Sequence, residues 1–501
     1  MRKSLLLSGL VLALTACDSS QPSFSGPYAD EDGNLRYGDL RFKPCALDGS
    51  ALNAVEAHCA KLKVPEDHDA PNGRQIELAI ALVPATGQAE ADPMLFIAGG
   101  PGQSALESYP LVHDAFADAV RNRHVLLVDA RGTGGSHPLK CKDREGKSGV
   151  GDSVDASSGA AREFAERCRD ALGKSSDLRR YTTGDHIRDL DLVRRTLGVA
   201  QLNLVGVSYG TRVAQQFAKR YPQQTRTVTL DSVVPNTLVL GQEHARNLDA
   251  ALKLQFSRCK ADAGCKRNLG DPSELLARVR ERLQSGGLTA VRFRDPVSGE
   301  WKEETPSFGH LALLLRLYAY QPQAAAMLPM ILHDADQGRY ETLLAQAGML
   351  NDDLSESIMH GMQLSVSCSE DHELKRDRID DDTVLGGEFV DFVLAQCAVW
   401  PTGKRDPIFR EPLRGATPVL AISGEFDPVT PPRYGDEVIK PLPNGRHLVL
   451  PGQGHSVLGV GCMPKLFAQF IETADAKALD ASCLKRLQAT PPFAGAYGWE
   501  P

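Results

Sequence analysis

Short, continuous apolar runs constrain the fold of this chain more than any other feature. Such runs lie within 76–85, 94–102 and 124–135, and the last two continue into GGPG and DARGTGG. Uninterrupted runs of about four to six apolar residues are typical of strands that are buried on both faces of a parallel sheet. A helical pattern follows over 183–197. Strands that alternate with helices predict an α/β fold with a mostly parallel central sheet and helices on both faces.

The alternation stops between about residues 241 and 400, where the pattern is mainly helical, and it resumes with strand-then-loop segments at 417–428 and 445–455. A helical block inside an α/β pattern indicates an inserted cap. We therefore expect a core whose first part spans 41–240, a helical cap over 241–400, and a C-terminal core part over 401–501. Helices are expected within the cap at 273–284, 310–320 and 327–348.

The N-terminus predicts an export signal. It has a basic start and a ten-residue apolar run from 5 to 14, and it ends in LTAC. This ending resembles the lipobox of bacterial lipoproteins. The resemblance implies a signal peptide over 1–16, lipidation of Cys17, and a membrane anchor on the periplasmic side of a bacterial membrane. The alternative is an ordinary secretory signal and a secreted protein. Residues 17–40, rich in Ser, Pro, Gly and Asp, predict a flexible tether.

The cysteine count agrees with export. Cys17 aside, ten cysteines are present, an even number that predicts disulfides in an oxidising compartment. Connectivity cannot be deduced from a sequence, and pairing of neighbours is the simplest hypothesis. That hypothesis joins Cys45 with Cys59, Cys141 with Cys168, Cys259 with Cys265, Cys368 with Cys397, and Cys462 with Cys483.

Charge and motifs exclude several function classes. The formal net charge of −8 shows no basic excess, which argues against a nucleic-acid partner. The sequence has no phosphate-binding loop and no dinucleotide fingerprint that opens a helix, and the cysteines and histidines lack zinc-ligand spacing. We therefore expect no cofactor and no metal. The sequence does not determine the oligomeric state.

The segment LNLVGVSYGTRVAQQF places Ser208 in a G-x-S-x-G motif between a strand-like run at 202–206 and a helical pattern. Gly206 and Gly210 suit the sharp turn that presents a nucleophilic serine at a strand-to-helix corner. The helix N-terminus adds a positive dipole there. The alternative is a serine that only caps the helix. We expect Ser208 to be a nucleophile.

A nucleophilic serine needs a base and an orienting acid. Of the thirteen histidines, His455 follows a strand-like run and the loop PGQGH, and so lies where sites gather in α/β sheets. Asp427 follows the run LAIS in a proline-rich loop, and Glu425 is its rival. The order Ser208, Asp427, His455 is the one expected of α/β-hydrolases.

The oxyanion of such a reaction needs two backbone N–H donors. Tyr209, directly after the serine, should supply one of them. The loop GGPGQS should supply the other through Gly99 or Gly100, where the missing side chains allow the backbone to approach a substrate closely.

With these pieces in place, the chain resembles the α/β-hydrolases of the prolyl aminopeptidase and tripeptidyl aminopeptidase family, in particular the secreted bacterial branch. The resemblance implies a serine exopeptidase that acts on peptides with a free N-terminus. Ala98 and Tyr209 stand where single-residue prolyl aminopeptidases usually have His and Trp, which favours the tripeptidyl branch. The matching segments are GGPGQSA (99–105), VDARGTGGS (128–136), GDHIRDLDLVRRTLG (184–198), LVGVSYGTRVAQQFAKRYP (204–222), LDSVVP (230–235), SGEFDPVTPP (423–432) and GQGHSV (452–457).

The segment SVSCSED (365–371) resembles the family segment whose acidic residue receives the α-ammonium of the substrate. The resemblance implies this role for Glu370, with Asp371 as the second candidate. The alternative is a solvated acidic turn beside a disulfide. The functional hypothesis is a serine aminopeptidase that releases tripeptides or single residues such as proline. A carboxylesterase-type acyl hydrolase with the same triad and a non-catalytic binding lipoprotein are the alternatives.

Overall fold

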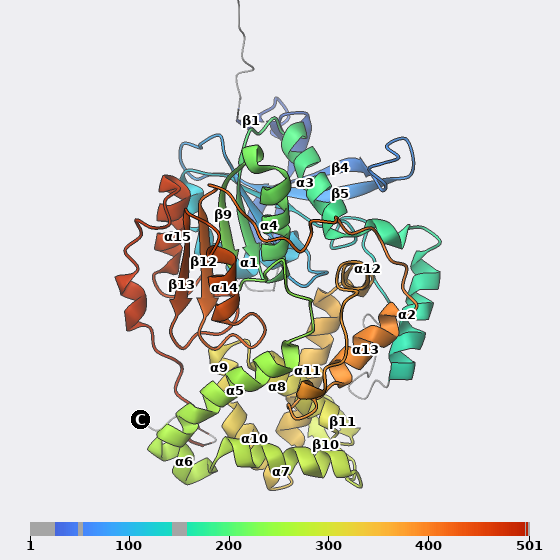
Figure 1. Ribbon diagram of the computed structural model, residues 1–501, viewed down its shortest axis with the longest axis vertical. Coiled ribbons are helices and arrows are strands. Elements are labelled where there is room, and N and C mark those ends of the chain that lie inside the picture. Colours follow the sequence, from blue (N-terminus) through green and yellow to red (C-terminus); the bar gives the residue numbers. More distant parts are fainter. Residues whose placement is uncertain (1–25, 49–53, 143–157, 496, 499–501) are drawn as a thin grey trace, which may run out of the picture.

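In the computed structural model, described over residues 26–48, 54–142, 158–495 and 497–498, one large sheet lies above a block of helices (Figure 1). The sheet has 11 strands in the order β1-β2-β3-β4-β5-β7-β6-β8-β9-β12-β13. Pairing is antiparallel from β1 to β7 and parallel from β7 to β13, which confirms the mostly parallel α/β prediction. The strands are Tyr28–Ala29, Leu35–Tyr37, Leu40–Asp48, Ala54–Pro65, Gln75–Val83, Met94–Ile97, Val125–Val128, Leu202–Val207, Thr225–Asp231, Val419–Gly424 and Gly445–Leu450, which are β1 to β9, β12 and β13.

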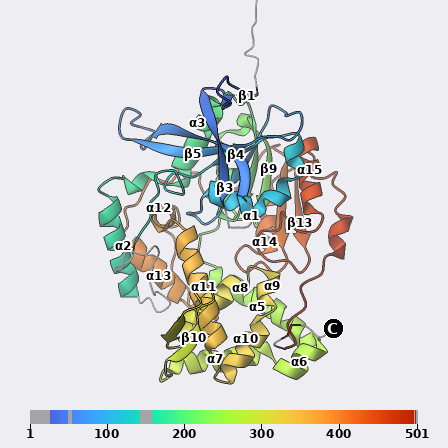
Figure 2. The same cartoon turned by 180° about the vertical axis from the view of Figure 1, so that it is seen from behind.

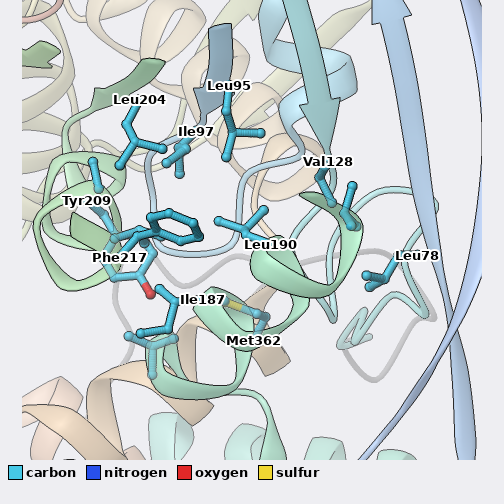
Figure 3. Packing of buried hydrophobic residues seen from close by; sticks show 14 of the residues in the cluster. Leu78, Leu95, Ile97, Val128, Ile187, Leu190, Leu204, Tyr209, Phe217 and Met362 are labelled. Atoms are coloured by element: carbon cyan, nitrogen blue, oxygen red, sulfur yellow. The ribbon is translucent and has the colours of Figure 1, made fainter. Parts of the chain in front are cut away.

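Helices cover both faces of the sheet. One face packs against α3 and α4, and the other against α1 and α15, in two apolar clusters. Figure 3 shows the first cluster, in which Leu95 and Leu204 of the sheet lie near Leu190 of α3 and Phe217 of α4. The helices of the sheet layers are α1 (Ala105–Val112), α2 (Ser158–Leu172), α3 (Thr183–Thr196), α4 (Tyr209–Arg220), α14 (Pro432–Ile439) and α15 (Met463–Thr473).

The inserted segment between β9 and β12 is mainly helical and has an apolar core of its own, built by α5, α7, α8, α10 and α11. The helix expected over 327–348 is two helices, because Gly338 adopts a φ of +79° between them. A hairpin of β10 (Val291–Arg294) and β11 (Trp301–Glu304) was not expected. The helices are α5 (His244–Ala261), α6 (Ala263–Leu269), α7 (Pro272–Ser285), α8 (Phe308–Tyr318), α9 (Pro322–Ala325), α10 (Leu328–Asp336), α11 (Glu341–Ser357), α12 (His360–Glu370) and α13 (Glu388–Cys397).

One helix within the expected cap boundaries belongs to the sheet core by its packing. Met362, Leu364 and Val366 of α12 lie in the apolar cluster that also contains α3 and α4, and not in the core of the cap. Figures 1 and 2 both show α12 between the sheet layers and the helices of the cap. The C-terminal end of α12 is therefore held close to the sheet.

The tether expected over 17–40 needs a correction at its C-terminal end. The strands β1 and β2 lie within it, and β3 starts at Leu40. Tyr37 and Leu40 are 5% and 8% exposed in the core, so burial of these two side chains anchors the segment. The many polar residues around them make this anchoring hard to predict from composition. The predicted signal peptide and Cys17 lie outside the described residues.

Five disulfides join cysteines that are neighbours in the sequence: Cys45–Cys59, Cys141–Cys168, Cys259–Cys265, Cys368–Cys397 and Cys462–Cys483. Disulfides are typical of oxidising compartments, which supports an exported protein. Within the described ranges, no helix has the length and apolar character that a membrane crossing requires. The same ranges hold no group of His, Cys, Asp and Glu side chains suited to a metal ion.

Candidate active site

Ser208 lies in a sharp turn between β8 and α4, with φ and ψ of 55° and −124°. Its backbone N–H donates to the carbonyl of Asp231 at 2.9 Å, which ties the turn to β9. Glycine is required on both sides of the serine. A Cβ on Gly206 would lie 2.4 Å from the carbonyl oxygen of Gly210, and a Cβ on Gly210 would lie 2.3 Å from that of Ile97. This is the strained strand-to-helix geometry in which a nucleophile is presented.

His455 and Asp427 form a buried pair, and Asp231 connects the loop of His455 to the turn of Ser208. The Nδ1–H group of His455 donates to Oδ2 of Asp427 at 2.8 Å, and the two residues are 7% and 2% exposed. Asp427 also accepts the N–H groups of Val429 and Thr430 and the hydroxyl of Thr430. The carboxylate is thereby fixed in one orientation, and it leaves Nε2 of His455 as the ring nitrogen that can accept a proton.

The charges of this pair support each other. Burial alone raises the pKa of the Asp427 carboxyl, but the His455 ring and the N–H donors outweigh burial and hold that pKa below its ordinary value. Burial alone lowers the pKa of His455, and the Asp427 carboxylate outweighs it, so the net pKa lies above 6.5. The acid therefore stays ionised, and the base becomes a stronger proton acceptor.

Two residues that the sequence analysis did not identify fix the loop of His455. Asp231, at the end of β9, accepts the N–H groups of Val457 and Leu458 at 2.9 Å. From the cap, the carbonyl of Tyr320 accepts the N–H of His455 at 2.8 Å, and the Tyr320 ring packs edge-on against the imidazole with centroids 4.9 Å apart. Asp231 belongs to the segment LDSVVP, whose position after a strand was a usable signal, whereas nothing local marks Tyr320.

The candidate oxyanion donors lie next to Ser208. Tyr209 is the first residue of α4, where a backbone N–H has no partner inside the helix. The backbone of Gly99 passes so close that a Cβ on it would lie 3.1 Å from Cβ of Ser208. Gly100 adopts a φ of +105°, a conformation that favours glycine. A pocket beside these glycines is lined by residues that include Gln103, His186 and Met362.

Glu370 ends α12 and is 1% exposed. Its carboxylate accepts the N–H of Thr183 at 2.5 Å and the Thr183 hydroxyl at 2.8 Å. The same hydroxyl contacts the phenol of Tyr209, so one threonine links Glu370 to the residue after Ser208. Burial raises the pKa of Glu370 to about 7, because no cation contacts the carboxylate directly among the described residues and Arg212 lowers it only in part.

Asp371 differs from its neighbour, and its contacts argue against the expected role as a second amine-binding carboxylate. The side chain pairs with Arg212 at 3.2 Å and with Arg410 at 2.9 Å, and it accepts the N–H of Leu240. Two guanidinium groups already neutralise this buried carboxylate. Asp371 therefore holds α12 against α4, and of these two neighbours only Glu370 has no ion pair with another described residue.

Comparison with known proteins fixes the family. The family described as alpha/beta hydrolase fold matches residues 92–461, which is most of the chain. The chain belongs to the alpha/beta hydrolase family. In the serine hydrolases of this family, the chain order is serine, acid, histidine, and the serine lies in a sharp strand-to-helix turn. Ser208, Asp427 and His455 follow this order, and Ser208 lies in such a turn. The chain is therefore a serine hydrolase.

Three relatives of this hydrolase narrow the chemistry. The serine protease Hip1 of Mycobacterium tuberculosis is 27% identical over 450 residues, covering 83% of this chain and 85% of that protein. The tripeptidyl aminopeptidase of Streptomyces lividans is 26% identical over 485 residues, covering 90% and 87%. Carboxylesterase B of Mycobacterium tuberculosis is 37% identical over 190 residues, covering 36% of each chain. The two relatives matched over most of their length are peptidases, which supports a serine peptidase.

Proposed function

We propose that this hydrolase is a serine aminopeptidase that releases tripeptides, or single residues such as proline, from peptides with a free N-terminus. One observation carries the proposal. Glu370 is a buried carboxylate that no cation contacts within the described part of the chain, and it is linked through Thr183 to the residue that follows Ser208. A buried ionised carboxylate is costly unless a cation pairs with it, and the α-ammonium of a bound peptide is such a cation.

In the proposed mechanism, the Ser208 hydroxyl attacks the scissile carbonyl while Nε2 of His455 takes its proton. Asp427 keeps the imidazole in the required tautomer and stabilises the imidazolium. The tetrahedral intermediate collapses, the scissile C–N bond breaks, and His455 gives the proton to the leaving amine. A water molecule that His455 activates then hydrolyses the acyl-enzyme, which releases the N-terminal segment and restores Ser208.

Oxyanion stabilisation is assigned to the backbone N–H of Tyr209 and to one N–H of the Gly99–Gly100 segment. The support for Tyr209 is its place at the first position of α4, and the support for the glycine segment is the close approach of Gly99 to Ser208. Because the hydroxyl of Tyr209 contacts Thr183, the same residue connects the oxyanion donor to the carboxylate that receives the amine.

A preference for tripeptides over single residues is supported by the likeness to the tripeptidyl aminopeptidase over 90% of this chain. Ala98 and Tyr209, which differ from the pattern of single-residue prolyl aminopeptidases, agree with it. The second candidate function is that of a carboxylesterase, and the likeness to carboxylesterase B over 36% of the chain favours it. That match leaves most of the chain outside it, so the peptidase is preferred.

Product analysis tests the proposal. Unmodified peptides of five to eight residues are incubated with the disulfide-bonded protein, and the fragments are identified by mass spectrometry. We expect N-terminal fragments of one fixed length to accumulate, and we expect none with Ser208→Ala. Hydrolysis of short-chain esters by the wild type without any peptide product would contradict the aminopeptidase and favour the esterase. Cleavage at internal bonds of N-acetylated peptides would contradict the exopeptidase.

The proposed location is the periplasmic side of a bacterial membrane, with a lipid on Cys17, and the alternative is a secreted protein. The LTAC sequence after a short apolar run and the five disulfides support it. Expression in a bacterial host with fractionation tests it. The wild type should sediment with membranes and carry the mass of a lipid, and Cys17→Ser should be recovered without one. A wild type that is cleaved elsewhere and carries no lipid would show an ordinary secretory signal.

A further inference from the structure

A second pocket lies between the cap and the loop that carries the candidate acid. It is lined by His244 and Leu248 of α5, Arg316 of α8, Leu385 and Phe389, and by Pro428 and Val429 directly after Asp427. Figures 1 and 2 both show α5 and α8 facing the loops that follow β12 and β13. This pocket therefore adjoins the acid and base, whereas the pocket beside Gly99 adjoins the oxyanion donors.

Arg316 gives the second pocket an uncompensated positive charge. Among the described residues no carboxylate lies within ion-pair distance of its guanidinium, and most other buried or half-buried arginines of this protein have one. Instead, the Arg316 guanidinium lies 5.0 Å from the ring centroid of Phe389. It is also close enough to Tyr320 to lower the pKa of that phenol, against burial, which raises it. Stacking on a ring orients a guanidinium and leaves its other N–H groups free to bind an anion.

The other titratable group of this pocket adds no charge. Burial and the nearby Arg316 together lower the pKa of His244 to about 3, so the ring is neutral near pH 7. Asp427 directly precedes the lining residues Pro428 and Val429, and its carboxylate is already engaged by His455 and by two backbone N–H groups. An anion that entered the pocket would therefore meet one cation and an apolar wall.

The direction of a bound peptide places this pocket on the side of the leaving group. In the proposed function, on which this step rests, the acyl segment runs from Ser208 past Tyr209 toward Glu370. The leaving segment must then run the other way, past His455, which protonates its amine. Tyr320 packs on His455, and Arg316 lines the pocket together with Pro428 and Val429, directly after Asp427. The first residues of the leaving segment therefore pass close to this guanidinium.

We infer that Arg316 binds a carboxylate of the leaving segment and so determines specificity on that side of the cut bond. The carboxylate is either the C-terminal one of a single leaving residue or an acidic side chain close to the cut. A guanidinium that is stacked and partly desolvated recognises a carboxylate through paired, charge-assisted hydrogen bonds. Peptides that carry such a group are preferred substrates over otherwise identical neutral ones.

Matched peptide pairs test this inference. The acyl segment X is the one that the product analysis identifies. The pair X-Gly and X-Gly-amide tests the terminal carboxylate, and X-Asp-amide with X-Asn-amide tests the acidic side chain. For the wild type we expect kcat/KM to be about tenfold to a hundredfold higher for the acidic member of at least one pair. Which pair responds tells the two sources of the carboxylate apart.

Variants of Arg316 distinguish binding of the substrate carboxylate from a role that only positions Tyr320. Arg316→Gln should bring the acidic-to-neutral ratio of kcat/KM close to one, mainly through KM, and Arg316→Lys should keep part of the ratio. Arg280→Gln is the matched control, because Arg280 also lies over a cap ring, Phe308, but does not line the pocket. It should keep the wild-type ratio.

Two results would overturn the inference. One is a wild type that cleaves both members of each pair equally well. The other is an Arg316→Gln protein that loses activity on both members alike and keeps the wild-type ratio, since that is the effect of a residue that only positions Tyr320.

The anilide X-p-nitroanilide has no carboxylate and is assayed alongside. If the wild type fails to cleave the anilide, the proposed function fails. If the wild type cleaves the anilide but shows no preference within either peptide pair, only the role of Arg316 fails.

Discussion

Asp427 and Glu425 lie two residues apart in the loop after β12, and only Asp427 faces His455. Glu425 accepts the N–H of Gly452 instead. We expect Asp427→Asn to lower kcat by about a thousandfold to ten-thousandfold, because the amide no longer fixes the tautomer or stabilises the imidazolium. Glu425→Gln should stay close to wild type, since its amide oxygen can still accept the Gly452 N–H. Steady-state kinetics of both variants, with circular dichroism as a folding check, decides between the two carboxylates. A large loss of kcat in Glu425→Gln and a small one in Asp427→Asn would make Glu425 the acid.

The pH dependence of kcat/KM should report two groups of the free enzyme. His455, whose pKa lies above 6.5, must lose a proton before it can act as a base, and Glu370, with a pKa raised to about 7 by burial, must lose one before it can pair with an ammonium. Activity on a free-amine substrate should therefore fall on acidification with a slope that approaches two per pH unit. It should also fall above about pH 8, where the substrate amine loses its proton.

Glu370→Gln provides the matched control for this profile. The glutamine can still accept from Thr183, but it no longer titrates, so the acid limb should fall with a slope of one and kcat/KM should be lower at its maximum. A profile that keeps its slope of two in Glu370→Gln would show that the second proton belongs to another group.

At the scale of elements, the start of α4 depends on the absence of a side chain at Gly210. Gly210→Ala places a Cβ 2.3 Å from the carbonyl oxygen of Ile97, so β6 and α4 must move apart. We expect a loss of stability of about 3 kcal/mol or more. Gly348→Ala is the control, because Gly348 lies inside α11 with nothing within 4 Å of the added Cβ. That change should raise stability by up to about 1 kcal/mol. Thermal unfolding of both variants measures the contrast, and equal shifts would contradict it.

The elements that the sequence predicted well are those whose local pattern and tertiary role agree. The run before Ser208 is β8, and the helical pattern at 273–284 is α7, Pro272–Ser285. The hairpin β10–β11 was missed because its strands are short, mostly exposed and lack a clear alternation. The strands before residue 40 were missed because few apolar side chains anchor them, and those side chains find their partners in distant segments.

The same limit applies to the candidate site. Ser208, Asp427 and His455 follow strands, so topology alone gathers them at one edge of the sheet, and the sequence could predict their meeting. Tyr320 contacts His455 across 135 positions of chain, and no periodicity marks such a contact in advance. The difference between Glu370 and Asp371 is likewise tertiary, because Arg212 and Arg410 come from segments far away in the sequence.

At the scale of the whole molecule, the disulfides close loops of different lengths. Cys368–Cys397 closes a loop with a sequence separation of 29 and links α12, which carries Glu370, to α13, whereas Cys259–Cys265 has a separation of 6. From loop-closure entropy alone, removing the disulfide that closes the longer loop should lower the free energy of unfolding by about 4 kcal/mol. Removing the one that closes the shorter loop should lower it by about 2 kcal/mol. Paired Cys→Ala variants, compared by thermal unfolding, check this. A larger effect of the shorter loop would contradict it.

The central claim is that a triad of Ser208, Asp427 and His455 serves a site that requires a free peptide amine. The most direct test is the ratio of kcat/KM for a tripeptidyl p-nitroanilide with a free N-terminus to that of its N-acetylated form, measured on the wild type near pH 7.5 with Ser208→Ala as the blank. Since a buried ion pair with Glu370 is lost on acetylation, we expect a ratio of about a hundred or more. A ratio near one, with both substrates cleaved by the wild type and neither by Ser208→Ala, would leave the serine hydrolase intact and contradict the aminopeptidase.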